Sequence, residues 1–261
     1  MFGAVMNSED QIKYKVADYP FEKCDFWHYL KIFYKDRGLK VLYQFLNRPH
    51  RRSFSRGLIK KFAPTGFGLE IGVGARTICP TDRTILSDAF SAHGVHDSID
   101  KIFFKGSVIP YDDNSFSFVL SEHVLEHIAN PLKTLEDCIR VLVPGGKLFL
   151  FLPHRDRTND SHRQLTTLEH VIKDYKMNVA FDDDTHVEDW FKNVVKKGLM
   201  PIHYSHLSKR DLLKTRSIHQ HVWTEKQVVE MLEYLNLKIC YVSARVKDRR
   251  DSFVVIAEKR A

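Results

Sequence analysis

The stretch Gly68-Leu-Glu-Ile-Gly-Val-Gly-Ala-Arg76 decides the fold of this chain. Its apolar beginning predicts a buried strand that runs directly into a glycine turn. Gly72 and Gly74 carry no Cβ, so the backbone of the turn can approach a ligand closely. The third glycine of the dinucleotide-binding pattern is replaced here by Thr77. The turn therefore indicates a binding loop but does not by itself identify the ligand.

Short apolar runs alternate with amphipathic stretches around this loop, which predicts βαβ units and an α/β fold with a mostly parallel sheet. The expected strands are Phe67–Ile71, Thr84–Ser87, Ile102–Phe104, Phe116–Leu120, Lys147–Leu152, Lys238–Val246 and Ser252–Glu258. The expected helices after the loop are Ser121–His127, Leu132–Leu142 and Glu225–Tyr234, the last with Thr224 as its N-cap.

Changes in sequence texture divide the chain into four parts. Residues 1–63 form a basic, helical N-terminal segment, and residues 64–153 form the Rossmann-like core. Residues 154–222 are polar and rich in His and Asp, and we expect them to be an inserted helical lid. Residues 223–261 supply a last helix and two strands that complete the core.

Composition excludes several classes of protein. Of the 261 residues, 43% are hydrophobic, which is typical of a folded globular chain. The longest apolar runs have about five residues, against the roughly 20 that a membrane-spanning helix needs. We see no secretory signal, and the four widely spaced cysteines indicate neither a disulfide framework nor a zinc site. These features together predict a cytoplasmic protein.

Two further motifs follow the glycine turn at intervals. They are Ile109-Pro-Tyr-Asp-Asp-Asn-Ser-Phe-Ser-Phe-Val-Leu-Ser-Glu-His-Val-Leu-Glu-His-Ile128 and Arg140-Val-Leu-Val-Pro-Gly-Gly-Lys-Leu148. With Glu70 two residues before the first glycine, the chain resembles the class I S-adenosylmethionine-dependent methyltransferases of the type 11 group. The resemblance is strong over residues 67–153 and weak over the last two strands.

This resemblance implies a Rossmann-like sheet of seven mostly parallel strands with an antiparallel last strand, N-terminal helices and a helical lid. It also implies S-adenosylmethionine as cofactor and S-adenosylhomocysteine as its product.

Carried over residue by residue, the resemblance implies a cofactor site. It assigns the methionine moiety to Glu70, Gly72 and Gly74, the ribose to Asp88, the adenine to backbone groups from Ser107 to Ile109, and the sulfonium end to Ser121 and Glu122. Only 13 residues separate Gly74 from Asp88, so Asp82 is a second candidate for the ribose.

Methyl transfer from a sulfonium is an in-line displacement with an activated donor. The protein therefore mainly aligns the reactants and removes a proton if the acceptor is a hydroxyl. His154, at the tip of the strand Lys147–Leu152, is the first candidate base, and Glu122 and His123 are the next. An Asn/Asp-Pro-Pro-Tyr motif is absent after the fourth strand, which argues against amide methylation of DNA or protein.

The acceptor pocket is expected in the segment after His154, because eight of the 14 histidines lie between residues 154 and 221. The candidate substrate-binding residues are Arg163, Thr167, His170 and His221. This segment also resembles, less specifically, the lid of methyltransferases of surface-polysaccharide biosynthesis, which implies a sugar or a phosphorylated or nucleotide-linked sugar as acceptor. A metal interpretation is invited by the run Phe181–Asp189 and by the pairs His203/His206 and His219/His221, but no recognised ligand spacing is present and no metal is expected.

The basic charge is concentrated near the N-terminus, where Lys31–Lys61 contains ten basic residues and one acidic residue. Three interpretations stay open: a solvated helix face, a clamp for an anionic acceptor, and a surface for RNA or an acidic membrane. The expected partner is thus a small-molecule or saccharide acceptor, anionic in character. The alternatives are an RNA methyltransferase, another small-molecule methyltransferase, and a non-catalytic cofactor-binding subunit.

Overall fold

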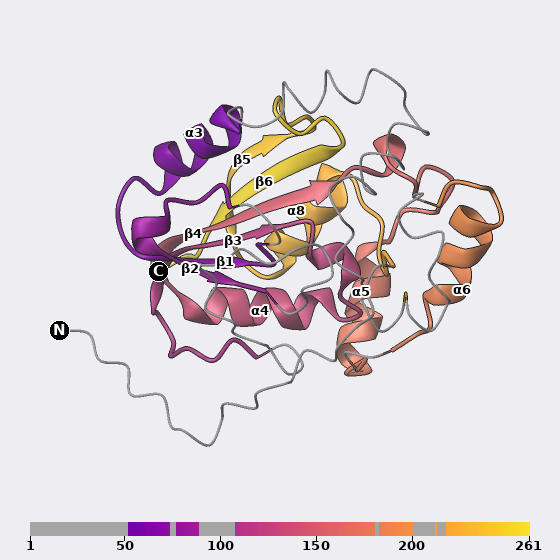
Figure 1. The fold of residues 1–261 in the computed structure, drawn as a ribbon. Helices are drawn as coiled ribbons and strands as arrows, with labels where there is room; N and C mark the ends of the chain where they lie inside the picture. The colour runs from indigo at the N-terminus through magenta and orange to yellow at the C-terminus, as the bar shows by residue number, and fades with distance from the viewer. Residues whose placement is uncertain (1–51, 74–76, 89–107, 181–182, 201–211, 213–217) are drawn as a thin grey trace, which may run out of the picture.

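The structure is a computed structural model that describes residues 52–73, 77–88, 108–180, 183–200, 212 and 218–261 (Figure 1). Within these ranges six strands form one sheet in the order β2-β1-β3-β4-β6-β5. The strands are β1 (Gly68–Ile71), β2 (Thr84–Ser87), β3 (Phe116–Glu122), β4 (Leu142–Pro153), β5 (Lys238–Ser243) and β6 (Ser252–Glu258). The helices are α3 (Ser53–Phe62), α4 (Pro131–Val141), α5 (Leu168–Lys176), α6 (Val187–Trp190) and α8 (Glu225–Tyr234). Short helical turns are η1 (Thr81–Arg83), η3 (Leu125–His127), η4 (Arg155–Arg157) and η5 (Phe191–Val195).

The sheet has the predicted Rossmann-like character. Strands β2, β1, β3 and β4 are parallel, and β6 is antiparallel to both β4 and β5. The expected seventh strand, Ile102–Phe104, lies outside the described residues, as do the expected helices before residue 52. In the sheet, β2 pairs with one side of β1, and β3, which comes later in the chain, pairs with the other side. The carboxyl ends of β1 and β3 therefore flank the switch point at which α/β sheets bind ligands.

Helices cover both faces of the sheet. The run Leu148–Leu152 is apolar at every position, so both of its faces must be buried. On β6, side chains point alternately to the two faces, because the strand period is two. Phe253, Val255 and Ala257 join the core beneath α4 and α8. Val254 and Ile256 join the core beneath α3 on the other face. The helices seen on either side of the sheet in Figure 1 thus enclose two continuous apolar layers.

Local sequence signals account for the helix boundaries in the core. Helix α4 begins after Asn130, whose side chain accepts a hydrogen bond from the Lys133 backbone N–H, with Pro131 in the first turn. Helix α8 begins with a capping box between Thr224 and Gln227. The predictions of both helices, and of Thr224 as a cap, are confirmed.

The predicted helix Ser121–His127 is wrong. Strand β3 continues through Ser121 and Glu122, which pair with Leu150 and Phe151 of β4. His123 then takes a positive φ of 54°, which ends the strand, and only the three-residue turn η3 follows. The ladder with β4 satisfies the backbone groups that a helix would have paired internally.

The segment after β4 contains the helices α5 and α6 and the short helical turns η4 and η5 in its described parts, joined by irregular stretches. It has a small core of its own, formed by Val187, Trp190, Val194, Leu212 and Ile218. Among the described residues, no helix has both the length and the apolar character that a membrane crossing requires.

Candidate functional site

The glycine turn lies at the switch point, in close contact with its neighbours. Gly72 has a φ of 73°, and its N–H donates to the Ser87 carbonyl at 2.8 Å. The Val73 N–H donates to the same carbonyl at 3.1 Å, so the turn is joined to the end of β2, where Asp88 follows. A Cβ added at Gly72 would lie 2.1 Å from the Val124 side chain. Only glycine meets both the backbone and the space requirements.

Glu70 lies beneath this turn with 1% of its surface exposed. Its carboxylate accepts a hydrogen bond from the Thr77 hydroxyl, which in turn accepts one from the Cys79 N–H at 2.8 Å. Burial raises the pKa of Glu70 from 4.5 to about 7. A cationic group brought to this carboxyl would favour its charged form. Glu70 is therefore suited to receive an ammonium group.

Glu122, at the end of β3, is held by two arginines. Its Oε1 accepts hydrogen bonds from Arg52, just before α3, and from Arg249, in the β5–β6 turn, the latter at 2.7 Å. The Arg52 Nε also lies 3.7 Å from Asp248 Oδ1. The carboxylate of Glu122 thus anchors two segments over the switch point.

His123 and the buried Glu126 lie close together beside Glu122, with 18% of the His123 side chain exposed. The Ser252 hydroxyl donates to Asp251 at 2.8 Å, so it accepts from the His123 Nε2–H at 2.7 Å. The lone pair of His123 is then on Nδ1, 3.6 Å from Glu126 Oε1. Burial, with the positive charge of Arg249 next in importance, lowers the pKa of His123 well below its usual value.

Glu126 is 1% exposed, and neither of its carboxylate oxygens has a hydrogen-bond partner. Burial raises its pKa from 4.5 to about 7. A carboxyl with this pKa can exchange a proton near neutral pH.

His154 lies between the end of β4 and the start of η4. Its Nδ1 accepts from the Asp156 N–H at 3.2 Å, and its Nε2 lies 3.7 Å from Glu225 Oε2. Burial lowers its pKa. These contacts cap the turn η4, and both ring nitrogens face groups of the protein.

Of the other predicted cofactor residues, Ser121 lies near the carboxyl end of β3, beside the switch point. Ser121 is buried in β3, between β1 and β4. The Ile109 N–H donates to the Asp137 carboxylate and the Ile109 carbonyl accepts from Arg140 at 2.8 Å, so these backbone groups already have partners. Asp82 is exposed in η1. Gly74 and Ser107 lie outside the described residues.

The four predicted substrate-binding residues lie in the segment after β4. Arg163 is 4% exposed and donates to Asp160, Asp189 and the carbonyls of His219 and Gln220. Thr167 caps α5 by accepting from the His170 N–H at 3.3 Å. His170 and His221 come together in a cluster of side chains described below.

Sequence reasoning missed three features of the site. Arg249 was not expected at Glu122, since 127 residues separate them in the chain. Glu126 was not among the candidate residues, and its burial without a hydrogen-bond partner is visible only in the fold. The i, i+4 spacing of His170 and Asp174 on one helix face was a usable signal for the third feature, the cluster.

Three comparisons with known proteins bear on this geometry. Residues 81–150 match the family model described as "Methyltransferase domain". An uncharacterized protein of Methanocaldococcus jannaschii is 37% identical over 38% of this chain and 50% of its own length. A sterol 4-C-methyltransferase of Caenorhabditis elegans is 27% identical over 36% of this chain and 29% of its own length. The chain thus spans half or less of the length of these curated relatives.

Among solved structures, a SAM-dependent methyltransferase from Aquifex aeolicus is 16% identical, with a TM-score of 0.46. The match covers 82% of this chain and 95% of the chain of that structure. Residues 81–150 therefore match a methyltransferase domain, which supports the resemblance to S-adenosylmethionine-dependent methyltransferases found in the sequence.

Proposed function

We propose that this protein transfers a methyl group from S-adenosylmethionine to a hydroxyl of a small-molecule acceptor, and that the acceptor is a sugar or a phosphorylated or nucleotide-linked sugar of a surface glycan. The observation that carries the proposal is the grouping of Glu70, Gly72 and Asp88 around one turn, beside the acid–base pair of His123 and Glu126.

The residues at the turn fit the cofactor. The close packing at Gly72 leaves room only for backbone, and the buried carboxyl of Glu70 suits the ammonium of the methionine moiety. Asp88, directly after the strand that the turn contacts, is the carboxylate for the ribose hydroxyls. When bound, the cofactor supplies an activated methyl group, so that the protein needs mainly to orient the acceptor.

His123 would take the proton of the acceptor hydroxyl. Its low pKa keeps the ring neutral, Ser252 fixes the tautomer, and the Nδ1 lone pair is the accepting atom. Glu126, 3.6 Å away, stabilises the resulting imidazolium or takes the proton onward. Glu122, bound to two arginines, has instead a positioning role.

The relatives support a small-molecule acceptor. Their names include a sterol 4-C-methyltransferase and, at 26% identity over 44% of this chain, an ajmaline N-methyltransferase of Rauvolfia serpentina. A group that accepts a proton suits a hydroxyl acceptor, because the hydroxyl loses its proton when it is methylated. Polar contacts of Arg52 and Arg249 near the site favour a saccharide over a sterol.

Calorimetry with S-adenosylmethionine and S-adenosylhomocysteine tests the cofactor site. We expect Asp88→Ala to weaken binding by about tenfold or more, or about 1.4 kcal/mol. The matched control Asp82→Ala should bind like the wild type. The reverse pattern would move the ribose to Asp82, and absence of binding by the wild type would contradict the proposal.

Turnover is measured as S-adenosylhomocysteine release with nucleotide sugars, free sugars and tRNA as acceptors. We expect a nucleotide sugar to be methylated and His123→Asn to lower kcat by about 10²–10⁴, with the exposed His162→Asn as control. Methylation of tRNA alone would contradict the saccharide assignment. Cofactor binding without turnover on any acceptor would indicate a non-catalytic subunit.

A further inference from the structure

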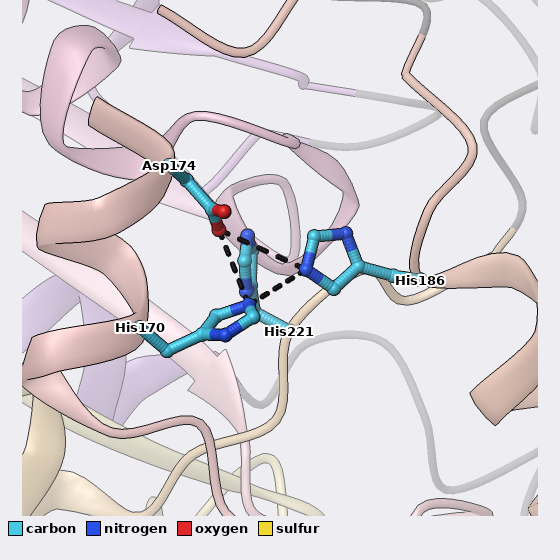
Figure 2. Close-up of side chains that lie close together, drawn as sticks. All are labelled: His170, Asp174, His186 and His221. Carbon is cyan, nitrogen blue, oxygen red and sulfur yellow. Dashed lines mark hydrogen bonds and ion pairs between the residues drawn. The ribbon is translucent and has the colours of Figure 1, made fainter. Parts of the chain in front are cut away.

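Four side chains from three separate segments meet in the part of the chain after β4 (Figure 2). His170 and Asp174 lie one turn apart on α5, His186 directly precedes α6, and His221 lies shortly before α8. One nitrogen or oxygen from each side chain lies within 4.8 Å of all the others. We call these four residues the histidine cluster.

The distances within the histidine cluster resemble those around a metal ion. His170 Nε2 lies 2.7 Å from His186 Nε2, and Asp174 Oδ2 lies 3.2 Å and 3.7 Å from these two atoms. Ligands about 2.0–2.1 Å from a tetrahedral zinc ion are separated by roughly 3.3 Å. The observed separations lie on both sides of that value, so small side-chain adjustments would create the geometry.

Two atoms of the cluster are buried without a hydrogen-bond partner, namely Asp174 Oδ2 and His221 Nδ1. The His221 Nε2 lies 3.2 Å from the Ala129 carbonyl, which can only accept, so the proton of the ring is on Nε2 and the lone pair on Nδ1. Metal-binding imidazoles commonly donate their second N–H to a carbonyl in this way. A buried polar atom without a partner is costly, and a cation would satisfy both atoms at once.

The second group of possible ligands, Glu126, His127 and His219, is less suitable. There the His219 Nδ1 is already bound to Asp160 at 2.5 Å.

We propose that His170, Asp174, His186 and His221 bind one divalent transition-metal ion, and that the ion is zinc in a closed, structural site. Three imidazoles and one carboxylate are a donor set that zinc accepts, and four protein ligands leave no position for a substrate. The sequence shows no recognised spacing of metal ligands, and for that reason we expected no metal. The ligands of the proposed site come from three segments that lie far apart in the chain, so no such spacing arises.

The bound ion would attach the segment after β4 to the core. It would join α5 to the approach of α6 and to the segment that leads into α8. The same segment contacts the proposed acid–base pair, because the backbone N–H groups of Gln220 and His221 donate to the Glu126 carbonyl at 2.6 Å and 3.2 Å. The ion therefore supports the position of η3 without touching the reacting groups.

The test uses the full chain, freed of metal with a chelator and then titrated with ZnCl₂. Calorimetry and elemental analysis should give one zinc ion per chain, and bound zinc should raise the melting temperature. His186→Ala and Asp174→Asn should each weaken zinc binding by about 100-fold or more, beyond the 10–100-fold typical of outer-shell changes. The exposed His162→Ala is the matched control and should bind like the wild type.

Co²⁺ in place of Zn²⁺ gives a second measurement that does not depend on a variant. A tetrahedral site gives strong visible absorption, and a six-coordinate surface site does not. S-adenosylmethionine binding by each variant reports that it is folded and separates this test from that of the proposed function. The proposal is overturned if the wild type binds no stoichiometric zinc, or if Glu126→Gln abolishes binding while His186→Ala retains it.

Discussion

Glu70 shows at the scale of one residue how burial changes the ionisation of a carboxyl group. The carboxyl has lost nearly all its hydration, and the Thr77 hydroxyl compensates only in part, so its pKa lies at about 7. An arriving ammonium group would restore the favourable interactions of the charged form. In the proposed function, the residue would thus couple its own ionisation to binding of the cofactor.

The affinity for S-adenosylmethionine should therefore rise with pH up to about 7, by as much as about tenfold per pH unit, and then level off. Glu70→Gln should remove this dependence and weaken binding at pH 8. Calorimetry at several pH values between about 5.5 and 8 measures the effect, with the exposed Glu230→Gln as control. An unchanged pH profile in Glu70→Gln would show that another group receives the ammonium.

At the scale of an element, α5 depends on its first residue. Thr167 satisfies an N–H group at the start of the helix, and the same helix carries His170 and Asp174 of the histidine cluster. The sequence predicts that Thr167 binds substrate, whereas the structure shows it as a helix cap, and these two roles make different predictions.

Thr167→Ala should lower the free energy of unfolding by about 1 kcal/mol through loss of the cap, whereas Thr167→Ser should retain it. Urea denaturation of metal-free protein measures the difference. If the alanine variant keeps its stability and shows instead a raised KM for the acceptor, Thr167 binds substrate and its cap is unimportant.

At the scale of the whole molecule, two buried carboxyls determine part of the pH dependence of stability. Glu70 and Glu126 both have pKa values of about 7 in the folded protein, above the usual 4.5. The folded state holds these protons over a pH range in which the unfolded chain has lost them. Their contribution is fully present below about pH 4.5 and is lost as the pH rises through about 7.

The variant Glu70→Gln/Glu126→Gln should therefore be as stable as the wild type at pH 4.5 and more stable at pH 8, by a few kcal/mol. Chelator keeps the histidine cluster metal-free in both proteins. Urea denaturation at the two pH values gives the result. A stability difference that stays constant with pH would contradict the assignment.

The sequence by itself determined the layers of the fold and the place of the glycine turn. Its information there is local: the strand before Gly72, the Asn130 and Thr224 caps, and the apolar run of β4 depend on residues a few positions apart. It failed at Ser121–His127, where pairing with β4 overrode a helical pattern.

Only the tertiary structure decided which groups act together. Arg249 meets Glu122 across 127 positions, and His221 meets α5 across about 50. Glu126 and His123 acquire their altered pKa values from burial, which no single segment controls. Local propensities fix the elements of this protein, whereas proximity, desolvation and the orientation of lone pairs exist only once the elements have packed.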